Sequence, residues 1–166
     1  NRVGIIIFAG SSHIHCPITS DYAAAKLFLN SIDTQMISEQ GTDISSAISL
    51  ALNNIEDDLS KYKLLVLVSD GEEHEQNALN LAEQASNRGI IIHTVGIGST
   101  KSVPIPMGSG ATKSYKKDKN NNIVTTKLNK DLLRDISEIT NGIFVHLEKS
   151  HDTIDQLLLE IMAMDK

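Results

Sequence analysis

Aromatic residues are scarce in this 166-residue sequence, and tryptophan is absent. Aromatic residues make up 4% of the chain against 40% for all apolar residues, so a core must be built from Ile, Leu, Val and Ala. No apolar run approaches the roughly 18 residues that a membrane-spanning helix needs. The first residues also lack the basic start and apolar stretch of a signal peptide. We therefore predict one globular domain over residues 1–166, large enough to bury a core without disulfides.

Cysteine and positive charge are also limited. The single cysteine, Cys16, has no partner for an intramolecular disulfide, so cysteine usage leaves the redox compartment open. There are 15 Lys and Arg residues against 21 Asp and Glu residues, which gives a formal net charge of −6. Binding of phosphate backbones needs clustered Lys and Arg. We expect proteins or cations as partners, and no nucleic acid.

Apolar runs rich in β-branched residues alternate with helical patterns. The predicted strands are Val3–Ala9, His13–Ile18, Leu64–Val68, Ile90–Ile97 and Ile143–Leu147. Pro17 favours an edge position for the second strand, and the continuous Leu64–Val68 run indicates burial on both faces. This alternation predicts an α/β fold with a doubly wound, mainly parallel sheet.

Capping residues and apolar stripes locate the helices. The first begins at Ser20 or Asp21, and its inward residues are Ala24, Leu27, Phe28 and Ile32. After a loop over Thr34–Gly41, the second begins at Thr42 or Asp43, and its stripe is Ile44, Ala47, Ile48, Ala51, Leu52 and Ile55. Further helices are expected over Gln76–Asn87, Asn129–Thr140 and Ser150–Met164, the last with Ile154, Leu157, Leu158, Ile161 and Met162 inward. Between them, Gly98 to about Lys127 predicts a mobile excursion with a hairpin tip.

Two polar residues are placed at the edge where open α/β sheets bind ligands, outside the carboxyl ends of the strands. Thr42 opens a helix, and Asp70 follows the Leu64–Val68 strand, with Gly41 and Gly71 permitting close backbone approach. A hydroxyl and a carboxylate that converge would suit a hydrated divalent cation. Taken separately, a residue such as Thr42 is more often a helix cap than a ligand, and an Asp-Gly pair such as Asp70-Gly71 is more often a turn.

The order of the segments closely resembles von Willebrand factor A (VWA) domains. The resemblance rests on Arg2–Ala9, Pro17–Thr19, Asp21–Ala24, Gly41-Thr42, Ser69–Glu72 and His93–Gly98. Within the family, the chain is most similar to bacterial aerotolerance-type (Bat) membrane proteins, which have counterparts of Val103–Pro106, Thr126–Leu128 and Thr140–Gly142. The resemblance covers essentially the whole chain and implies a Rossmann-like VWA fold.

The resemblance also implies a metal-ion-dependent adhesion site (MIDAS). In such a site Mg²⁺ is held by residues matching Thr42 and Asp70, and a partner's carboxylate completes the coordination. The other family ligands lie in an Asp-x-Ser-x-Ser motif on the family's first strand, and this sequence contains no such motif. We therefore expect an N-terminally incomplete domain, lacking its first strand and helix, that binds Mg²⁺ no better than about millimolar. Thr42 and Asp70 should lie within about 8 Å of each other, around one hydrated cation.

The implied missing strand would lie between Val3–Ala9 and Leu64–Val68. Either these two strands pair directly and narrow the Thr42–Asp70 pocket, or a neighbouring chain supplies a strand and an intertwined homodimer results.

We expect a protein-interaction module that binds an acidic partner group, and no enzyme, because no nucleophile is paired with a general base. The alternative is a metal-dependent hydrolase or phosphoryl-transfer enzyme, with Asp70 as metal ligand and His74 as acid or base. A third possibility is a scaffold that no longer needs metal. Resemblance to Bat proteins implies a bacterial membrane protein anchored through flanking segments, and we expect the domain to face the periplasm.

Other features have plainer interpretations beside a functional one. His13, His15 and Cys16 would suit a soft metal, but surface positions on an edge strand explain them. Glu72–Glu75 is a solvated acidic loop, or it tunes the local field or contacts a basic partner. Gly108–Lys113 lacks the strand and helix of a phosphate loop, and Lys113–Lys119 is predicted to be a solvated hairpin.

Overall fold

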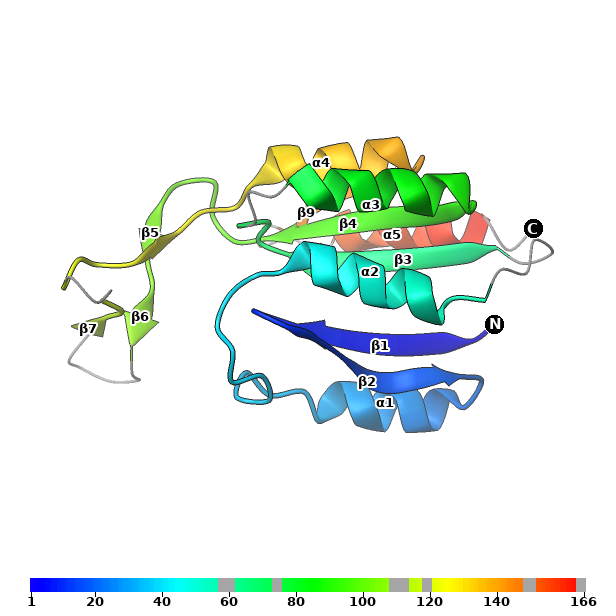
Figure 1. Cartoon of the computed structure of the whole chain (residues 1–166), viewed down its shortest axis with the longest axis horizontal. Coiled ribbons are helices and arrows are strands. Elements are labelled where there is room, and N and C mark those ends of the chain that lie inside the picture. Colours follow the sequence, from blue (N-terminus) through cyan, green and yellow to red (C-terminus); the bar gives the residue numbers. More distant parts are fainter. Residues whose placement is uncertain (57–61, 73–75, 108–113, 118–120, 148–151, 164–166) are drawn as a thin grey trace.

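The computed structural model describes residues 1–56, 62–72, 76–107, 114–117, 121–147 and 152–163 (Figure 1). Its central sheet contains β3 (Lys63–Ser69), β4 (Ile90–Ile97) and β9 (Phe144–Leu147), all parallel, in the order β3-β4-β9. These strands match three of the predicted segments, and β4 has the predicted bounds.

Helices cover both faces of this sheet. The helices of one face are α2 (Ile44–Asn54), α3 (Gln76–Asn87) and α4 (Lys130–Ile139), and α5 (Asp152–Ala163) lies on the other. Strand side chains alternate between faces. Accordingly, Ile92 of β4 belongs to the core under α2, α3 and α4, whereas Val95 packs with Val145 and Leu157 of α5. This is the doubly wound α/β arrangement that the sequence predicts.

Short polar side chains begin the helices, as expected. Asp21 caps α1 (Tyr22–Asn30) by accepting a hydrogen bond from the Ala24 backbone N–H, and Asp43 caps α2 in the same way at 2.7 Å from the Ser46 nitrogen. Asp43, rather than Thr42, is therefore the cap of α2, which leaves the Thr42 side chain for another role.

The first two strands form a separate antiparallel hairpin. β1 (Val3–Phe8) pairs with β2 (Ser12–Thr19), and α1 packs on both. β2 is an edge strand, as predicted. Direct pairing of β1 with β3, the first of the two predicted outcomes, does not occur among the described strands, which form separate sheets.

One face of β3 is open because α5 packs on its neighbours. Leu67 is buried, but Val66 and Val68, whose side chains point to the opposite face, are 39% and 47% exposed. α5 contacts β9 and the adjoining part of β4, so it leaves this part of β3 uncovered. The prediction that the Leu64–Val68 strand is buried on both faces is therefore wrong for these two valines.

α2 connects the hairpin to the parallel sheet. It contacts β1, β2 and α3. Its residues Ile44 and Ile48 are fully buried in the main core cluster, and Phe8 of β1 packs against that cluster. The predicted apolar stripe is confirmed, with Ile44, Ala47, Ile48, Ala51 and Leu52 buried and Ile55 partly buried against the same core.

Two of the predicted stripes are only partly buried. In α1, Ala25 is the buried residue among those described, while Leu27 and Phe28 are 72% and 41% exposed and Ile32 lies beyond the helix. In α5, Leu157 is buried, but Leu158 and Met162 are 50% and 66% exposed. Each helix contacts a small sheet with one side, so helical spacing alone overestimated the buried width.

The predicted excursion protrudes from the carboxyl end of the sheet (Figure 1, left). Its short strands are β5 (Val103–Pro104), β6 (Pro106–Met107), β7 (Ser114–Tyr115) and β8 (Thr125–Thr126). β5 pairs with β8 and β6 with β7, both antiparallel. Of the predicted hairpin tip, Lys116–Asn122, residues 118–120 lie outside the described residues, as does the segment Gly108–Lys113.

Candidate functional site

Asp70 lies directly after β3, at the carboxyl end of the central sheet. Its backbone carbonyl accepts a 2.8 Å hydrogen bond from the Asn129 N–H, which fixes the β3 end beside the start of α4. From the described residues its carboxylate accepts two long hydrogen bonds, one from the Glu72 N–H at 3.4 Å and one from the Thr126 hydroxyl at 3.3 Å. Bonds of this length are weak, so the half-buried carboxylate retains capacity for a cation.

Gly71 allows the chain to turn immediately after Asp70. Its φ is +69°, and a Cβ at this position would lie 2.7 Å from the Asn129 carbonyl oxygen. The Ser69 hydroxyl accepts a 3.0 Å hydrogen bond from the Gly71 N–H and is itself buried. Only glycine satisfies both the left-handed backbone and this close approach, so the turn is built to hold Asp70 in place.

Thr42 lies in the loop that enters α2. The loop is attached to the end of β1 because the Asp43 N–H donates a 2.7 Å hydrogen bond to the Ala9 carbonyl. Gly41 also lies close to Gly10, since a Cβ added to Gly41 would be 3.1 Å from the Gly10 Cα. Within the described part of the chain, the Thr42 hydroxyl has no hydrogen-bonding partner. A half-buried hydroxyl without a capping role is available as an oxygen ligand.

The start of α2 and the end of β3 lie at the same end of the molecule (Figure 1). The fold therefore places Thr42 and Asp70 at one edge, as the strand and helix order requires. Their approach to within about 8 Å, around one hydrated cation, stays a prediction.

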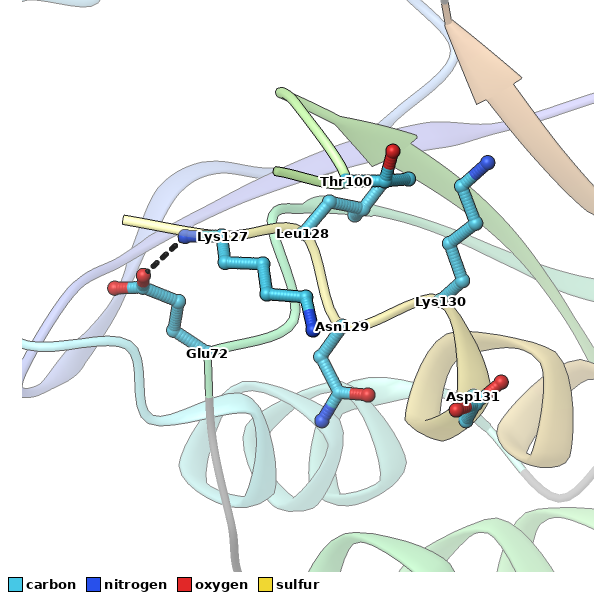
Figure 2. Close-up of a pocket in the computed structure, with 7 residues that line it drawn as sticks. All are labelled: Glu72, Thr100, Lys127, Leu128, Asn129, Lys130 and Asp131. Carbon is cyan, nitrogen blue, oxygen red and sulfur yellow. Dashed lines mark hydrogen bonds between the residues drawn. The ribbon is translucent and has the colours of Figure 1, made fainter. Parts of the chain in front are cut away.

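A pocket of about 700 Å³ adjoins this edge (Figure 2). It is lined by Glu72, Thr100 and the five residues Lys127–Asp131. The Glu72 carboxylate accepts a 2.8 Å hydrogen bond from the Lys127 N–H, which joins the loop after β3 to the segment entering α4. The pocket is therefore lined by acidic side chains, Glu72 and Asp131, and by basic ones, Lys127 and Lys130. It lies between the protruding segment and α4.

The oxygen atoms that Thr42 and Asp70 offer are of the type that a hard divalent cation binds. Carboxylate and hydroxyl oxygens suit Mg²⁺, which retains several waters where the protein supplies few ligands. Two such residues, Thr42 and Asp70, are available at this edge. No group of three or more His, Cys, Asp and Glu side chains with metal-binding geometry occurs within the described ranges.

The other candidate residues take structural roles or cannot be placed. His15 packs edge-on against the Phe28 ring and lies 2.9 Å from the Phe28 carbonyl oxygen, while His13 contacts Ser11. Cys16 is buried on the other side of β2. His74, the acid or base of the alternative enzyme hypothesis, and the acidic residues 73 and 75 lie outside the described residues.

The sequence profile of the von Willebrand factor type A domain matches residues 1–156. The chain belongs to this family. The VWA domain seen here is also similar to solved structures of two Bacteroides proteins. BatB from Bacteroides thetaiotaomicron is 35% identical, with a TM-score of 0.91 over 99% of this chain and 79% of its own.

An aerotolerance-related membrane protein from Bacteroides fragilis is 34% identical, with a TM-score of 0.87, and the match covers 98% of this chain and 80% of the relative. The resemblance to Bat proteins is thus confirmed. None of the described helices is long and apolar enough to cross a membrane. Among curated protein sequences, none is significantly similar.

More distant structures share the fold. Proximal thread matrix protein 1 from the mussel byssus, 15% identical, has a TM-score of 0.63, and the match covers 96% of this chain and 33% of that protein. That structure is described as having a zinc-occupied MIDAS motif.

Sequence reasoning missed Thr126 and Asn129 as neighbours of Asp70. Both come from a segment more than 50 residues further along the chain, and only the fold brings them to the end of β3. The similarity of Thr126–Leu128 to Bat proteins was the sequence feature that pointed to this segment. It did not predict a contact with Asp70.

Proposed function

We propose that this VWA domain is a protein-interaction module, in which Thr42 and Asp70 hold a hydrated Mg²⁺ that binds a carboxylate of a partner. The supporting observation is the Asp70 carboxylate at the carboxyl end of β3, held by the Gly71 turn and, among the described residues, bonded only at 3.3 and 3.4 Å. VWA domains commonly mediate protein interactions through such a site. When bound, the cation would supply an open coordination position for the partner's oxygen.

Calorimetric titration of Mg²⁺ tests the metal position. We expect a dissociation constant of about millimolar, because two protein ligands leave most of the coordination to water. Asp70→Asn and Thr42→Val should abolish the binding heat. Asp135→Asn, on the exposed side of α4, is the matched control and should leave the heat unchanged. If Asp70→Asn and Asp135→Asn gave equal heats of Mg²⁺ binding, Asp70 would not be a metal ligand.

The main alternative is a metal-dependent hydrolase or phosphoryl-transfer enzyme that uses Asp70 as ligand and His74 as acid or base. VWA domains are generally interaction modules, which favours binding over turnover. Hydrolysis of phosphate and carboxyl esters with Mg²⁺ discriminates the two functions. Turnover that is lost in both Asp70→Asn and His74→Ala would establish the enzyme, whereas the interaction module predicts no turnover above that of the buffer.

We further propose that a strand and helix preceding residue 1 complete the sheet between β1 and β3. Among the described strands none pairs with the facing edges of β1 and β3, and this and the exposed Val66 and Val68 support the proposal. A chain extended at its N-terminus should bind Mg²⁺ more tightly than residues 1–166, because it would add ligands to the same site.

We also propose that the domain is held at a bacterial membrane by flanking segments and faces the periplasm. The description of the Bacteroides fragilis relative as a membrane protein supports the membrane attachment. Protease treatment of intact spheroplasts checks the orientation, since a periplasmic domain is cleaved and a cytoplasmic one is protected.

A further inference from the structure

Positive charge in this acidic chain is concentrated in one segment. Residues 98–128 contain six lysines and one aspartate, which gives a formal charge of +5. Because the whole chain carries −6, the remaining residues must carry −11. We name residues 98–128 the basic arm. Such segregation creates a local field that attracts acidic groups, although the molecule as a whole repels them.

The basic arm extends from the edge that holds Asp70 and Thr42. Figure 1 shows its strands β5, β6 and β7 projecting beyond the carboxyl end of β4, away from the helices. Its described lysines are Lys101, Lys116, Lys117 and Lys127. Backbone hydrogen bonds join Ile105 to Val124, Lys116 to Ile105 and Val124 to Lys116, so the backbone of Lys116 is held between the short strands of the arm.

Apolar side chains are exposed between these lysines. Val103 and Tyr115 are each 40% exposed, and Ile123 is 50% exposed. Tyrosine is enriched at protein interfaces, and apolar area buried there adds affinity that charge alone does not supply. The arm therefore offers both charge and apolar area.

The root of the arm reaches the candidate metal ligand. Thr126 donates a hydrogen bond to the Asp70 carboxylate, and the next residue, Lys127, lines the pocket of Figure 2 together with Lys130. In Figure 2 the Lys127 side chain extends toward Asn129, whereas Lys130 points away on the side of Thr100. Among the described residues, neither lysine forms an ion pair with a carboxylate. Two ammonium groups thus line the pocket beside the Glu72 and Asp131 carboxylates, so the net positive charge of the surface comes from the lysines of the arm.

We infer that the basic arm and this pocket form a docking surface for an acidic segment of the protein partner. One carboxylate of the segment binds at the metal position, and this part rests on the proposed function. Further carboxylates bind Lys127 and Lys130 and then Lys116 and Lys117, while apolar residues between them contact Tyr115 and its exposed neighbours. Charge complementarity to the arm, on an otherwise acidic molecule, selects an acidic peptide over other occupants.

Fluorescence anisotropy with a labelled peptide that repeats Glu-Val-Glu-Gly tests this inference, in Mg²⁺ and in EDTA. We expect Lys116→Glu/Lys117→Glu and Lys127→Glu each to weaken binding about tenfold and to reduce its salt dependence, because each removes favourable charge contacts. Lys26→Glu, an exposed position on α1, gives the matched control for a single charge reversal and should bind like the unaltered protein. Thermal unfolding checks that the variants fold.

The two hypotheses fail separately in this experiment. If EDTA and Asp70→Asn leave peptide binding unchanged while the arm variants weaken it, the metal site is refuted and the docking surface stands. If Lys127→Glu binds like Lys26→Glu, or the unaltered protein does not bind the peptide, the docking surface is refuted whatever the metal does. Arm-dependent binding to phosphatidylglycerol vesicles, without peptide binding, would likewise overturn it in favour of a lipid surface.

Discussion

The Thr126 hydroxyl donates a 3.3 Å hydrogen bond to Oδ2 of Asp70, across 56 positions of the sequence. This contact joins the last strand of the basic arm, β8, to the turn that ends β3. The candidate metal ligand and the proposed partner surface are therefore in direct contact.

Replacement of Thr126 by valine tests the strength of that contact. Because the bond is long, we expect Thr126→Val to lower the free energy of unfolding by less than about 1 kcal/mol. Mg²⁺ affinity should change less than about threefold, since Oδ1 and the backbone contacts of Asp70 remain. Urea unfolding and calorimetry measure the two quantities. A loss of Mg²⁺ binding as large as that of Asp70→Asn would instead identify Thr126 as a ligand or an essential orienting group.

Gly71 and Gly89 have similar backbone conformations but different surroundings. Substituting each by alanine therefore separates the cost of backbone strain from the cost of a steric clash. Gly71 has a φ of +69° and Gly89 a φ of +65°, but an added Cβ contacts the Asn129 carbonyl at Gly71 and nothing within 4 Å at Gly89. We expect Gly89→Ala to cost about 1 kcal/mol of unfolding free energy, from the left-handed backbone alone. Gly71→Ala should cost about 3 kcal/mol, because the turn must also move away from α4. If urea unfolding gives the same loss of unfolding free energy for both variants, the turn at Gly71 can move away from α4 without further cost.

Buried His93 should make stability depend on pH. Burial lowers the pKa of His93 below its ordinary value of 6.5, and the nearby Glu160 carboxylate opposes this only in part. Its Nδ1 accepts a 3.0 Å hydrogen bond from the Ile143 N–H, which requires the neutral ring. The unfolded chain therefore binds a proton more readily, so this contribution to stability is present above about pH 6.5 and is lost as the pH falls toward the folded-state pKa.

The pH effect is isolated by comparison with His93→Gln. Chemical unfolding at a series of pH values should show that the unaltered protein loses more stability than the variant between neutral and acidic pH. The same slope in both proteins would assign the acid sensitivity to other groups.

Within the described part of the chain no strand pairs with the second edge of β1 or of β3, and these edges predict self-association of residues 1–166. Exposed strand edges recruit strands from other chains, and Val66 and Val68 add apolar area beside this edge. Light scattering should give the mass of a dimer for the 1–166 polypeptide, as in the second outcome expected from the sequence. Val68→Lys should shift the population toward the monomer. A chain that stays monomeric at high concentration would contradict this prediction.

Local sequence features predicted most of the elements. The boundaries of α3 and β4, and the helix start at Asp43, follow from capping residues, glycine stops and periodicity within a few residues of each position. The partial exposure of Val66 in β3 and of Leu27 in α1 did not follow, because exposure depends on what packs from elsewhere in the fold.

In the candidate site, too, some features follow from the sequence and others depend on the rest of the fold. The sequence order placed Thr42 and Asp70 at one edge, since the carboxyl ends of parallel strands meet there. Their separation and the contact from Thr126 depend on the path of the basic arm. Its Ser, Gly, Pro, Lys and Asn residues predict irregular structure but no particular route.

The attachment of the hairpin through α2 has a consequence for cooperativity. β1 and β2 share no backbone hydrogen bonds with β3, β4 and β9, and their main contacts with the remainder run through α2, Phe8 and the exposed Arg2–Glu56 ion pair. Backbone amides in the two sheets should therefore exchange with solvent deuterium as two units of unequal protection, the hairpin opening first. A ligand bridging Thr42 and Asp70 would connect the β1–α2 unit to the end of β3, and slower exchange across the hairpin would then report occupancy of the site.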